Sequence, residues 1–187
     1  HLKRISPVND VGFMGLDGYT MRNLEVFDSI SSHNINGTLI NCIDTTMTSG
    51  GGRLLYNWLR NPLADKKRIE SRLEIVEKFI IDKNLLKQLR LRLKKTLDIE
   101  RLISKISRGS GTPRELIGLY DTLHIYDKCI KDFKEIKEFE KFVLPYKNLD
   151  AVKFKIMKTL NKDAPQSLKK GNIIKTGVSE KLDEYRE

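Results

Sequence analysis

The sequence has few of the residues that build metal, disulfide or redox sites. It contains two cysteines, Cys42 and Cys129, with three histidines and one tryptophan. The two thiols are far apart and have no second thiol or histidine at ligand spacing, so neither a disulfide framework nor a zinc site is supported. We therefore expect a reducing cytosol. No apolar run approaches the roughly 20 residues of a membrane-spanning helix, and no secretory signal segment is present.

Catalytic and nucleotide-binding patterns are also missing. The stretch TSGGGRLL, residues 48–55, lacks the lysine and hydroxyl of a phosphate-binding loop, so a tight turn and helix start is favoured over a phosphate site near Arg53. His33 and His124 have no serine or cysteine placed to form a relay. Asp17 and Asp44 fit local capping better than a carboxylate pair. The sequence predicts no catalytic, cofactor-binding or metal-binding residue.

Positive charge is what the chain has in excess. Its net charge is +10, and residues 66–108 carry fourteen basic residues against six acidic ones, so most of the excess lies there. A polyanion partner is one interpretation of this segment. A solvated, lysine-rich helix face that serves solubility and local pairing is the other, and it is the more common use of such faces.

Helical periodicity dominates from Gly50 onward. Apolar residues recur at three and four residues, and Thr112-Pro113-Arg114-Glu115 is a capping box with proline at the first helical position. Three glycines predict that the first of these helices starts only near Arg53. The pattern predicts helices at about 53–60, 66–81, 85–93, 99–106, 112–126, 133–145 and 149–160, and a last one that Ser179 caps.

The N-terminal third reads differently from the rest. Strand-forming residue types occur at Val11, Phe13 and in the LEVF segment, residues 24–27. The composition of residues 29–37 predicts a loop. The stretch GNIIKTG, residues 171–177, is compatible with a short extended pair. We predict a mainly α fold, a helical bundle with a few short extended segments near the N-terminus and near 171–178. The chain begins at His1 and ends inside an expected helix, so we expect a piece of a longer protein.

Four stretches resemble one family in its own order. LDGYTMRNLE, residues 16–25, is similar to the signature that begins the core, or lever, domain of the MutS family of DNA mismatch-repair ATPases. Residues 38–80, with LINCIDTTMTSGGGRLLYNWLRNPLADKKRIESRL, resemble the run that follows, as do LDIERLISKISRGSGTPREL at 97–116 and IIKTGVSEKLDEYRE at 173–187. Ile43, where the family commonly has leucine, and the three successive glycines at 50–52 are mild departures.

The resemblance assigns a structural role to the matching residues. Asp17 and Thr20 are types that fix a turn, and Arg22, Asn23 and Glu25 are types that hold neighbouring segments, as a stiff joint between domains requires. The open alternative for this motif is an ordinary capped helix followed by a strand. The signature residues expected to form the joint are Leu16, Asp17, Thr20, Arg22, Asn23, Leu24, Glu25, Asp44, Thr46, Gly52, Arg53, Leu54, Leu55, Trp58, Pro62 and Leu63.

Trp58 carries the most specific expectation. Its place in RLLYNWLRNPL predicts a ring buried where a short helix meets the main bundle, and the alternative is a ring exposed for stacking on a nucleic acid base.

The resemblance also implies a domain plan and a function. Residues 1–178 correspond to the first part of the core domain, and 179–187 to the start of a lever helix that leads towards a clamp domain outside the chain. Such a piece has no enzymatic activity or cofactor of its own. It couples mismatched-DNA binding to an ATPase that uses ATP and Mg²⁺, with both sites lying elsewhere in the longer protein.

Partners and location follow from the same resemblance. The longer protein binds DNA through its other domains and forms a homodimer or a heterodimer with a paralogue, whereas this chain alone is expected to be monomeric and away from membranes. Its location would be cytoplasmic, near the nucleoid, in a bacterium and nuclear in a eukaryote. The rival hypothesis is an independent basic helical module that binds nucleic acid directly through residues 66–108, and steep salt dependence of binding would distinguish it. The branch of the family is left open.

Overall fold

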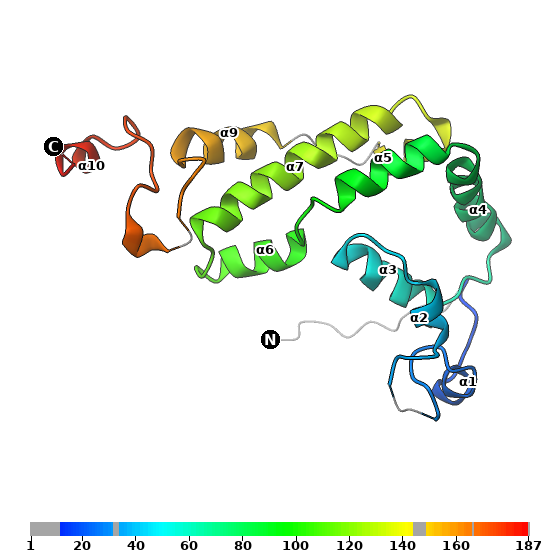
Figure 1. Cartoon of the computed structure of the whole chain (residues 1–187). Helices are drawn as coiled ribbons and strands as arrows, with labels where there is room; N and C mark the ends of the chain where they lie inside the picture. The colour runs from blue at the N-terminus through cyan, green and yellow to red at the C-terminus, as the bar shows by residue number, and fades with distance from the viewer. Residues whose placement is uncertain (1–11, 32–33, 144–148, 166, 187) are drawn as a thin grey trace. The chain divides into compact units, whose positions relative to one another are not determined.

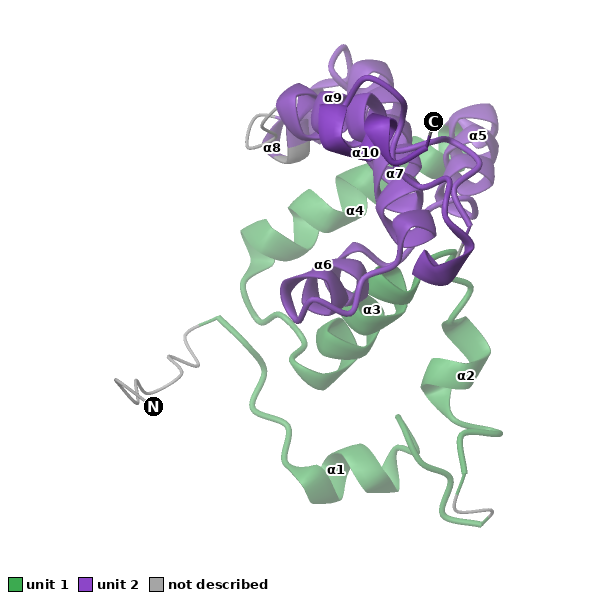
Figure 2. Ribbon diagram, turned by 90° about the vertical axis from the view of Figure 1, so that its left-hand side faces the viewer, with its two compact units in different colours: residues 1–81 green, residues 82–187 purple. Residues whose placement is uncertain are grey.

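The computed structural model describes residues 12–31, 34–143, 149–165 and 167–186, which form two compact units, residues 1–81 and 82–187 (Figure 2). His33, Val11 and Pro145, named in sequence-based expectations, lie outside the described residues. The first unit contains α1 (Gly18–Asn23), α2 (Leu39–Ile43), α3 (Ser49–Arg60) and α4 (Lys66–Ile81). The second contains α5 (Lys83–Leu93), α6 (Ile99–Ser107), α7 (Pro113–Phe133), η1 (Lys137–Phe139), α8 (Glu140–Val143), α9 (Asp150–Thr159), η2 (Leu168–Lys170) and α10 (Glu180–Glu184).

The fold class is therefore mainly helical, as the sequence predicts (Figure 1). Within the described ranges, extended pairing is limited to two isolated antiparallel bridges, Phe13 with Leu63 and Leu160 with Ile174. One partner of each bridge, Phe13 or Ile174, lies in a region where an extended segment is expected, and the other partner, Leu63 or Leu160, does not. None of the helices in the described ranges combines the length and the apolar character needed to traverse a bilayer.

Polar caps start the helices of the first unit. The side chains of Asp17, Thr38 and Thr48 each accept a hydrogen bond from a backbone N–H in the first turn of the helix that follows. Such a cap contributes about 1 kcal/mol. These short polar residues explain where α1, α2 and α3 begin, although the short helix α2 had no periodic signal to predict it.

Helix α3 begins at Ser49, and the expected start near Arg53 is wrong. Gly50, Gly51 and Gly52 are all helical, because the Thr48 hydroxyl accepts from the Gly51 N–H at 3.0 Å and fixes the first turn. A Cβ at Gly51 would lie 3.1 Å from Thr48 Oγ1 and 3.4 Å from Thr46 Cβ. The glycines therefore allow the preceding segment to pack against the helix start, which helix propensity alone does not reveal.

The LEVF segment is a turn, and its predicted strand is absent. Leu24 is the C-cap of α1, and Glu25 has a φ of 47°, in the left-handed region. The Val26 N–H then donates to the Met21 carbonyl at 3.1 Å. Local hydrogen bonding of the chain reversal overrides the strand preference of the β-branched and aromatic residues, since β-propensity depends strongly on context.

Helix α7 is the centre of the second unit, with α5, α6, α8 and α9 in contact with it (Figure 1). Its start is the predicted capping box, in which Thr112 and Glu115 exchange hydrogen bonds. The core that it organises consists of Leu102 from α6, Leu119 and Leu123 from α7, Ile156 from α9 and Leu160. Fully burying each of these side chains contributes about 2 kcal/mol.

The segment before α6 crosses α7 at a glycine. A Cβ on Gly118 would lie 2.4 Å from Leu97 Cδ1, so glycine allows Leu97 to approach the helix backbone. Beside it, the fully buried Thr122 hydroxyl accepts from the Leu97 N–H at 3.0 Å and donates to the Gly118 carbonyl at 2.8 Å. This polar pair fixes the depth at which the connection between α5 and α6 meets α7.

The single helix predicted over 133–145 is replaced by a break. Helix α7 continues to Phe133, Ile136 is extended, and η1 and α8 follow. The rings of Phe133 and Phe139 stack at 4.6 Å, and Phe139 is buried. Bringing these two rings together requires a reversal of the chain, which periodicity read along one straight helix does not predict.

The C-terminal residues return to the end of α9. The Asn161 N–H donates to the Ile173 carbonyl at 2.8 Å, and the Lys175 N–H donates to the Thr159 carbonyl at 2.9 Å, on either side of the Leu160–Ile174 bridge. Helix α10 starts after Ser179, as predicted, although the Ser179 side chain makes no capping hydrogen bond. The described part of α10 is only five residues long.

Candidate structural joint

The first part of the signature forms a closed turn around α1. Asp17 Oδ1 accepts from the Thr20 N–H at 2.7 Å, and this hydrogen bond, with a second from the Thr20 hydroxyl, lowers the pKa of Asp17. Glu25 ends the turn, and its Oε1 accepts from the Ile30 N–H at 2.6 Å and from the Ser29 hydroxyl at 3.1 Å. The Glu25 carboxylate therefore fixes the loop that follows α1 through charge-assisted hydrogen bonds.

Main-chain bonds join this turn to α2. The Leu39 N–H donates to the Glu25 carbonyl at 3.0 Å, and the Ile40 N–H donates to the Val26 carbonyl at 3.1 Å. Val26 and Ile40 are both buried at this contact. Glu25 thus holds two segments, the 29–30 loop through its side chain and α2 through its backbone.

The second part of the signature packs against the start of α3. Asp44 Oδ1 accepts from the Thr46 N–H at 2.9 Å, and this bond is the main cause of the lowered pKa of Asp44. Thr46 Oγ1 would lie 3.4 Å from a Cβ on Gly52, and Asp44 Oδ2 would lie 3.7 Å from it. Asp44, Thr46 and Gly52 are therefore neighbours in space, as their shared place in one motif suggests.

Two contacts connect the ends of the signature. The rings of Phe27 and Tyr56 are 4.2 Å apart, which joins the segment after α1 to α3. The bridge between Phe13 and the buried Leu63 is extended by a hydrogen bond from the Met14 N–H to the Pro62 carbonyl at 2.7 Å. We call this set of contacts, made by residues 13–30 and 38–63 of the first unit, the joint.

Within the first unit Trp58 is partly exposed, and its burial against the main bundle, which lies in the second unit, stays a prediction. Its side chain is 40% exposed, and the Arg72 guanidinium carbon lies 3.7 Å from the ring centroid. Burial against the ring, with repulsion from Arg68, lowers the pKa of Arg72. The periodicity of the sequence identified the face of α3 that carries Trp58. It could not identify the side chain that packs over the ring, which is the cationic Arg72 of α4.

Other signature residues contribute unequally. Leu16, Thr20, Leu55 and Pro62 are half-buried and Leu63 is buried, whereas the side chains of Arg22, Asn23, Leu24, Arg53 and Leu54 are exposed. The expected clamping role of Arg22 and Asn23 therefore remains a prediction, while that of Glu25 is visible in its hydrogen bonds.

Sequence reasoning missed the aromatic and cationic partners of the joint. Tyr56 and Phe27 occupy positions that the motif does not specify, and Arg68 and Arg72 read as part of a solvated face. Arg68 in fact lies 5.1 Å from the ring centroid of Phe13. The usable signal was the four-residue spacing of these two arginines, which places them on one side of α4.

The basic segment is divided between the two units. Several of its cations have acidic partners: Lys66 lies 3.7 Å from Glu70, Lys105 lies 2.7 Å from Glu115, and Arg92 pairs with Asp132. The Lys105 ammonium is the first cause of the Glu115 pKa of about 2. Local pairing therefore accounts for part of this charge. In the described ranges, no group of three or more His, Cys, Asp or Glu side chains is arranged to hold a metal ion.

Comparison with known proteins decides the family. The family model described as MutS domain III matches residues 19–186, which is nearly the whole chain. The chain belongs to the MutS domain III family. Relatives named DNA mismatch repair protein MutS are 34% identical in Halothermothrix orenii and 36% identical in Desulfitobacterium hafniense and Flavobacterium johnsoniae. Each match covers all of this chain and 21% to 22% of the relative, so the chain spans about a fifth of their length.

Membership in MutS domain III agrees with the observed fold. The matched range, residues 19–186, runs from α1 to α10 through both compact units and contains the Leu160–Ile174 bridge, whereas Phe13 of the other bridge precedes it. The signature residues from Thr20 to Leu63 lie inside the matched range, whereas Leu16 and Asp17 precede it. Most of the joint therefore lies inside the range that the family model matches.

Proposed function

We propose that this domain is a non-catalytic lever in a MutS-type mismatch-repair protein, and that the joint transmits conformational changes between a mismatched-DNA site and an ATPase site elsewhere in that protein. Residues 1–178 serve as the first part of the core domain, and 179–187 begin a lever helix. ATP and Mg²⁺ act at the distant ATPase, DNA is bound by other domains, and the longer protein works as a homodimer or a paralogue heterodimer.

One observation carries this proposal: a single residue, Glu25, fixes two segments of the joint at once. Its carboxylate accepts from Ile30 and Ser29, and its carbonyl accepts from Leu39, while its own backbone is in the left-handed region. Directional bonds of this kind permit one geometry where apolar packing alone permits several. A rigid element that two sites bias in common is the physical requirement for coupling between them.

The test uses the full-length protein that contains this domain. Glu25→Ala removes the carboxylate acceptor and introduces no new polar group. It should weaken the stimulation of ATP turnover by mismatched DNA at least about threefold. Coupling between two sites typically changes affinity by about 5- to 150-fold. Affinity for mismatched DNA without nucleotide, and turnover without DNA, should change by less than about twofold.

The matched control is Glu74→Ala, which removes an exposed glutamate from α4 in the same unit. It should leave both activities and their coupling unchanged. The proposal is refuted if Glu25→Ala couples DNA to turnover as well as the wild type does, or if Glu74→Ala uncouples them equally.

A further inference from the structure

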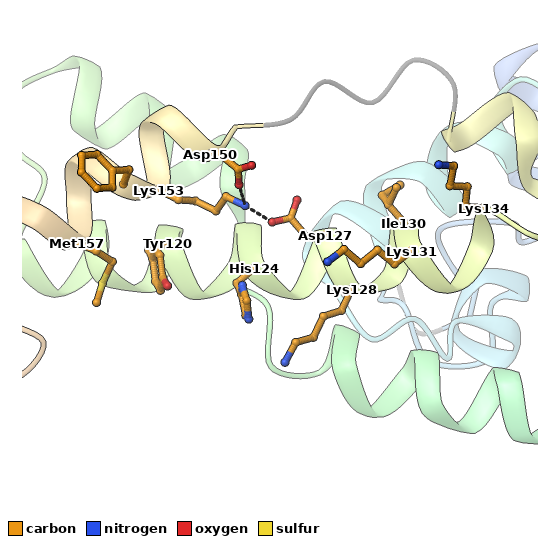
Figure 3. A pocket seen from close by; sticks show the side chains of 11 residues that line it. Tyr120, His124, Asp127, Lys128, Ile130, Lys131, Lys134, Asp150, Lys153 and Met157 are labelled. Carbon is orange, nitrogen blue, oxygen red and sulfur yellow. Dashed lines mark hydrogen bonds and ion pairs between the residues drawn. The ribbon is translucent and has the colours of Figure 1, made fainter.

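A groove of about 750 Å³ runs between α7 and α9 in the second unit (Figure 3). Its apolar and aromatic lining, called the floor below, consists of Tyr120 and Ile130 from α7 and Phe154 and Met157 from α9. Phe154 is 67% exposed, which is unusual for a phenylalanine on a helix whose opposite side is in the core. The groove therefore offers apolar and aromatic surface that the described chain leaves in contact with solvent.

One edge of the groove is basic. Lys128 and Lys131 on α7 and Lys134, the C-cap of α7, follow one another at three-residue spacing, and all three are exposed. This spacing spans about 9 Å along the helix axis. No ion pair connects any of the three to an acidic residue in the described ranges.

The acidic residues of the lining are already engaged. Asp127 and Asp150 both pair with Lys153, whose side chain is buried between them, and the Lys153–Asp150 distance is 2.6 Å (Figure 3). Asp132, on the next turn after Lys128, pairs with Arg92. The groove consequently presents an apolar floor and a net positive edge, and its own carboxylates do not neutralise that edge.

We propose that this groove binds an acidic amphipathic helix of a separate protein partner, with apolar side chains against Phe154 and Met157 and carboxylates opposite Lys128, Lys131 and Lys134. A helix presents neighbouring carboxylates at three- and four-residue spacing, which matches the lysine row, beside an apolar stripe that suits the floor. Exposed ion pairs contribute about 0.2 to 1 kcal/mol each, so the floor must supply much of the affinity.

A nucleic acid strand fits this groove less well. Stacking of successive bases requires several free aromatic faces, whereas the Tyr120 ring already lies parallel to His124, with their centroids 6.3 Å apart. Ile130 and Met157 provide aliphatic surface, which has neither a positive charge for phosphate nor an aromatic ring for base stacking. Charge complementarity with an apolar floor thus favours a peptide of acidic and apolar residues.

The test measures binding of fluorescent probes by anisotropy, using the 187-residue chain and the full-length protein that contains it. The probes are an 18-residue helical peptide with leucines at helical spacing beside a row of glutamates, a peptide of the same composition in scrambled order, and a 20-nucleotide oligothymidylate. The helical peptide should bind at least about tenfold more tightly than either other probe, and it should do so in both proteins.

Two variants and one control assign the binding to the groove. A triple variant in which Lys128, Lys131 and Lys134 are all replaced by glutamate should weaken peptide binding at least tenfold. Phe154→Ala should weaken it about tenfold. Both variants should keep the circular dichroism spectrum of the wild type. The control is a triple variant in which the exposed Lys155, Lys162 and Lys169, which lie outside the groove, are replaced by glutamate. It changes the net charge by the same amount as the groove variant and should change the affinity for the peptide less than threefold.

Each other outcome overturns the proposal. Equal binding of the scrambled peptide would show nonspecific attraction. Tighter binding of the oligonucleotide, lost in the triple variant, would make the groove a nucleic acid site. Binding by the 187-residue chain but not by the full-length protein would show that another segment of the same protein occupies the groove.

Discussion

Replacing Lys153 by methionine tests the ion pairs that fasten α9 to α7. The Lys153 side chain is 11% exposed and pairs with Asp127 from α7, which is 16% exposed, and with Asp150 at the start of α9, which is 69% exposed. Methionine preserves most of the apolar stem but removes the charge. Asp127 then loses its lysine in a largely buried setting, whereas Asp150 remains solvated.

The magnitude follows from these exposures. Breaking a buried ion pair by removing one partner costs about 3 to 5 kcal/mol, and an exposed pair contributes about 0 to 1 kcal/mol. Water that reaches the partly exposed Asp127 reduces the first value. We therefore expect Lys153→Met to lower the free energy of unfolding by about 2 to 4 kcal/mol, and Asp150→Asn by less than about 1 kcal/mol.

Urea unfolding followed by circular dichroism measures both changes. Lys155→Met is the matched control, because Lys155 is an exposed lysine on the same helix. The two aspartates, Asp127 first, raise the pKa of Lys153 above its ordinary value of 10.5. The stabilising contribution of the charged Lys153 is therefore complete below about pH 10.5 and is lost only as the pH rises through the higher pKa of the folded state. The loss of unfolding free energy caused by Lys153→Met should thus be equal at pH 7 and pH 9. The reasoning is refuted if Lys153→Met and Lys155→Met unfold at the same urea concentration.

Three further predictions follow from the structure. Trp58→Ala should cost about 1 to 2 kcal/mol in urea unfolding, less than a fully buried tryptophan, because the ring is 40% exposed and covered mainly by Arg72; a loss above about 4 kcal/mol would contradict this placement. Glu115 has a pKa of about 2, and Lys105 is the first cause of the lowering. The stabilising contribution of the Glu115 carboxylate should therefore be complete above its ordinary pKa of 4.5 and should decline as the pH falls towards 2. If the unfolding free energy of Glu115→Gln fell with pH as steeply as that of the wild type, this prediction would be contradicted. The chain should bind neither ATP at micromolar concentration nor DNA with steep salt dependence, and calorimetry with ATP and anisotropy with duplex DNA from 50 to 200 mM salt would reveal either.

Local signals made part of the fold predictable. The capping box at Thr112 and Glu115 appears as written in the sequence, because both partners lie within four residues of each other. Helix α4 spans Lys66–Ile81 as its apolar period predicts. Caps and periodicity depend on neighbours along the chain, and these are what a sequence displays.

The remaining features depend on contacts between distant residues. The glycine start of α3 depends on the packing of Thr46 against it. The break after Phe133 depends on the stacking of its ring with Phe139. The partial exposure of Trp58 depends on the side chain that covers its ring, Arg72. For the joint, the sequence indicated Asp17, Glu25 and Asp44 but not Phe27 and Tyr56, since a motif does not state which of its variable positions meet in space.

Coupling through the Phe27–Tyr56 contact tests the central claim most directly. In the full-length protein, the coupling free energy is obtained from the affinity for mismatched duplex with and without nucleotide. Phe27→Ala and Tyr56→Ala should each reduce the change in affinity that nucleotide produces by at least about threefold, and the double variant should lose little more, because the two rings act as one contact. Tyr19→Ala, which removes a ring that is 77% exposed on α1, should leave the coupling intact. Unchanged coupling in both single variants, with normal DNA affinity, would contradict the proposal that the joint transmits the signal.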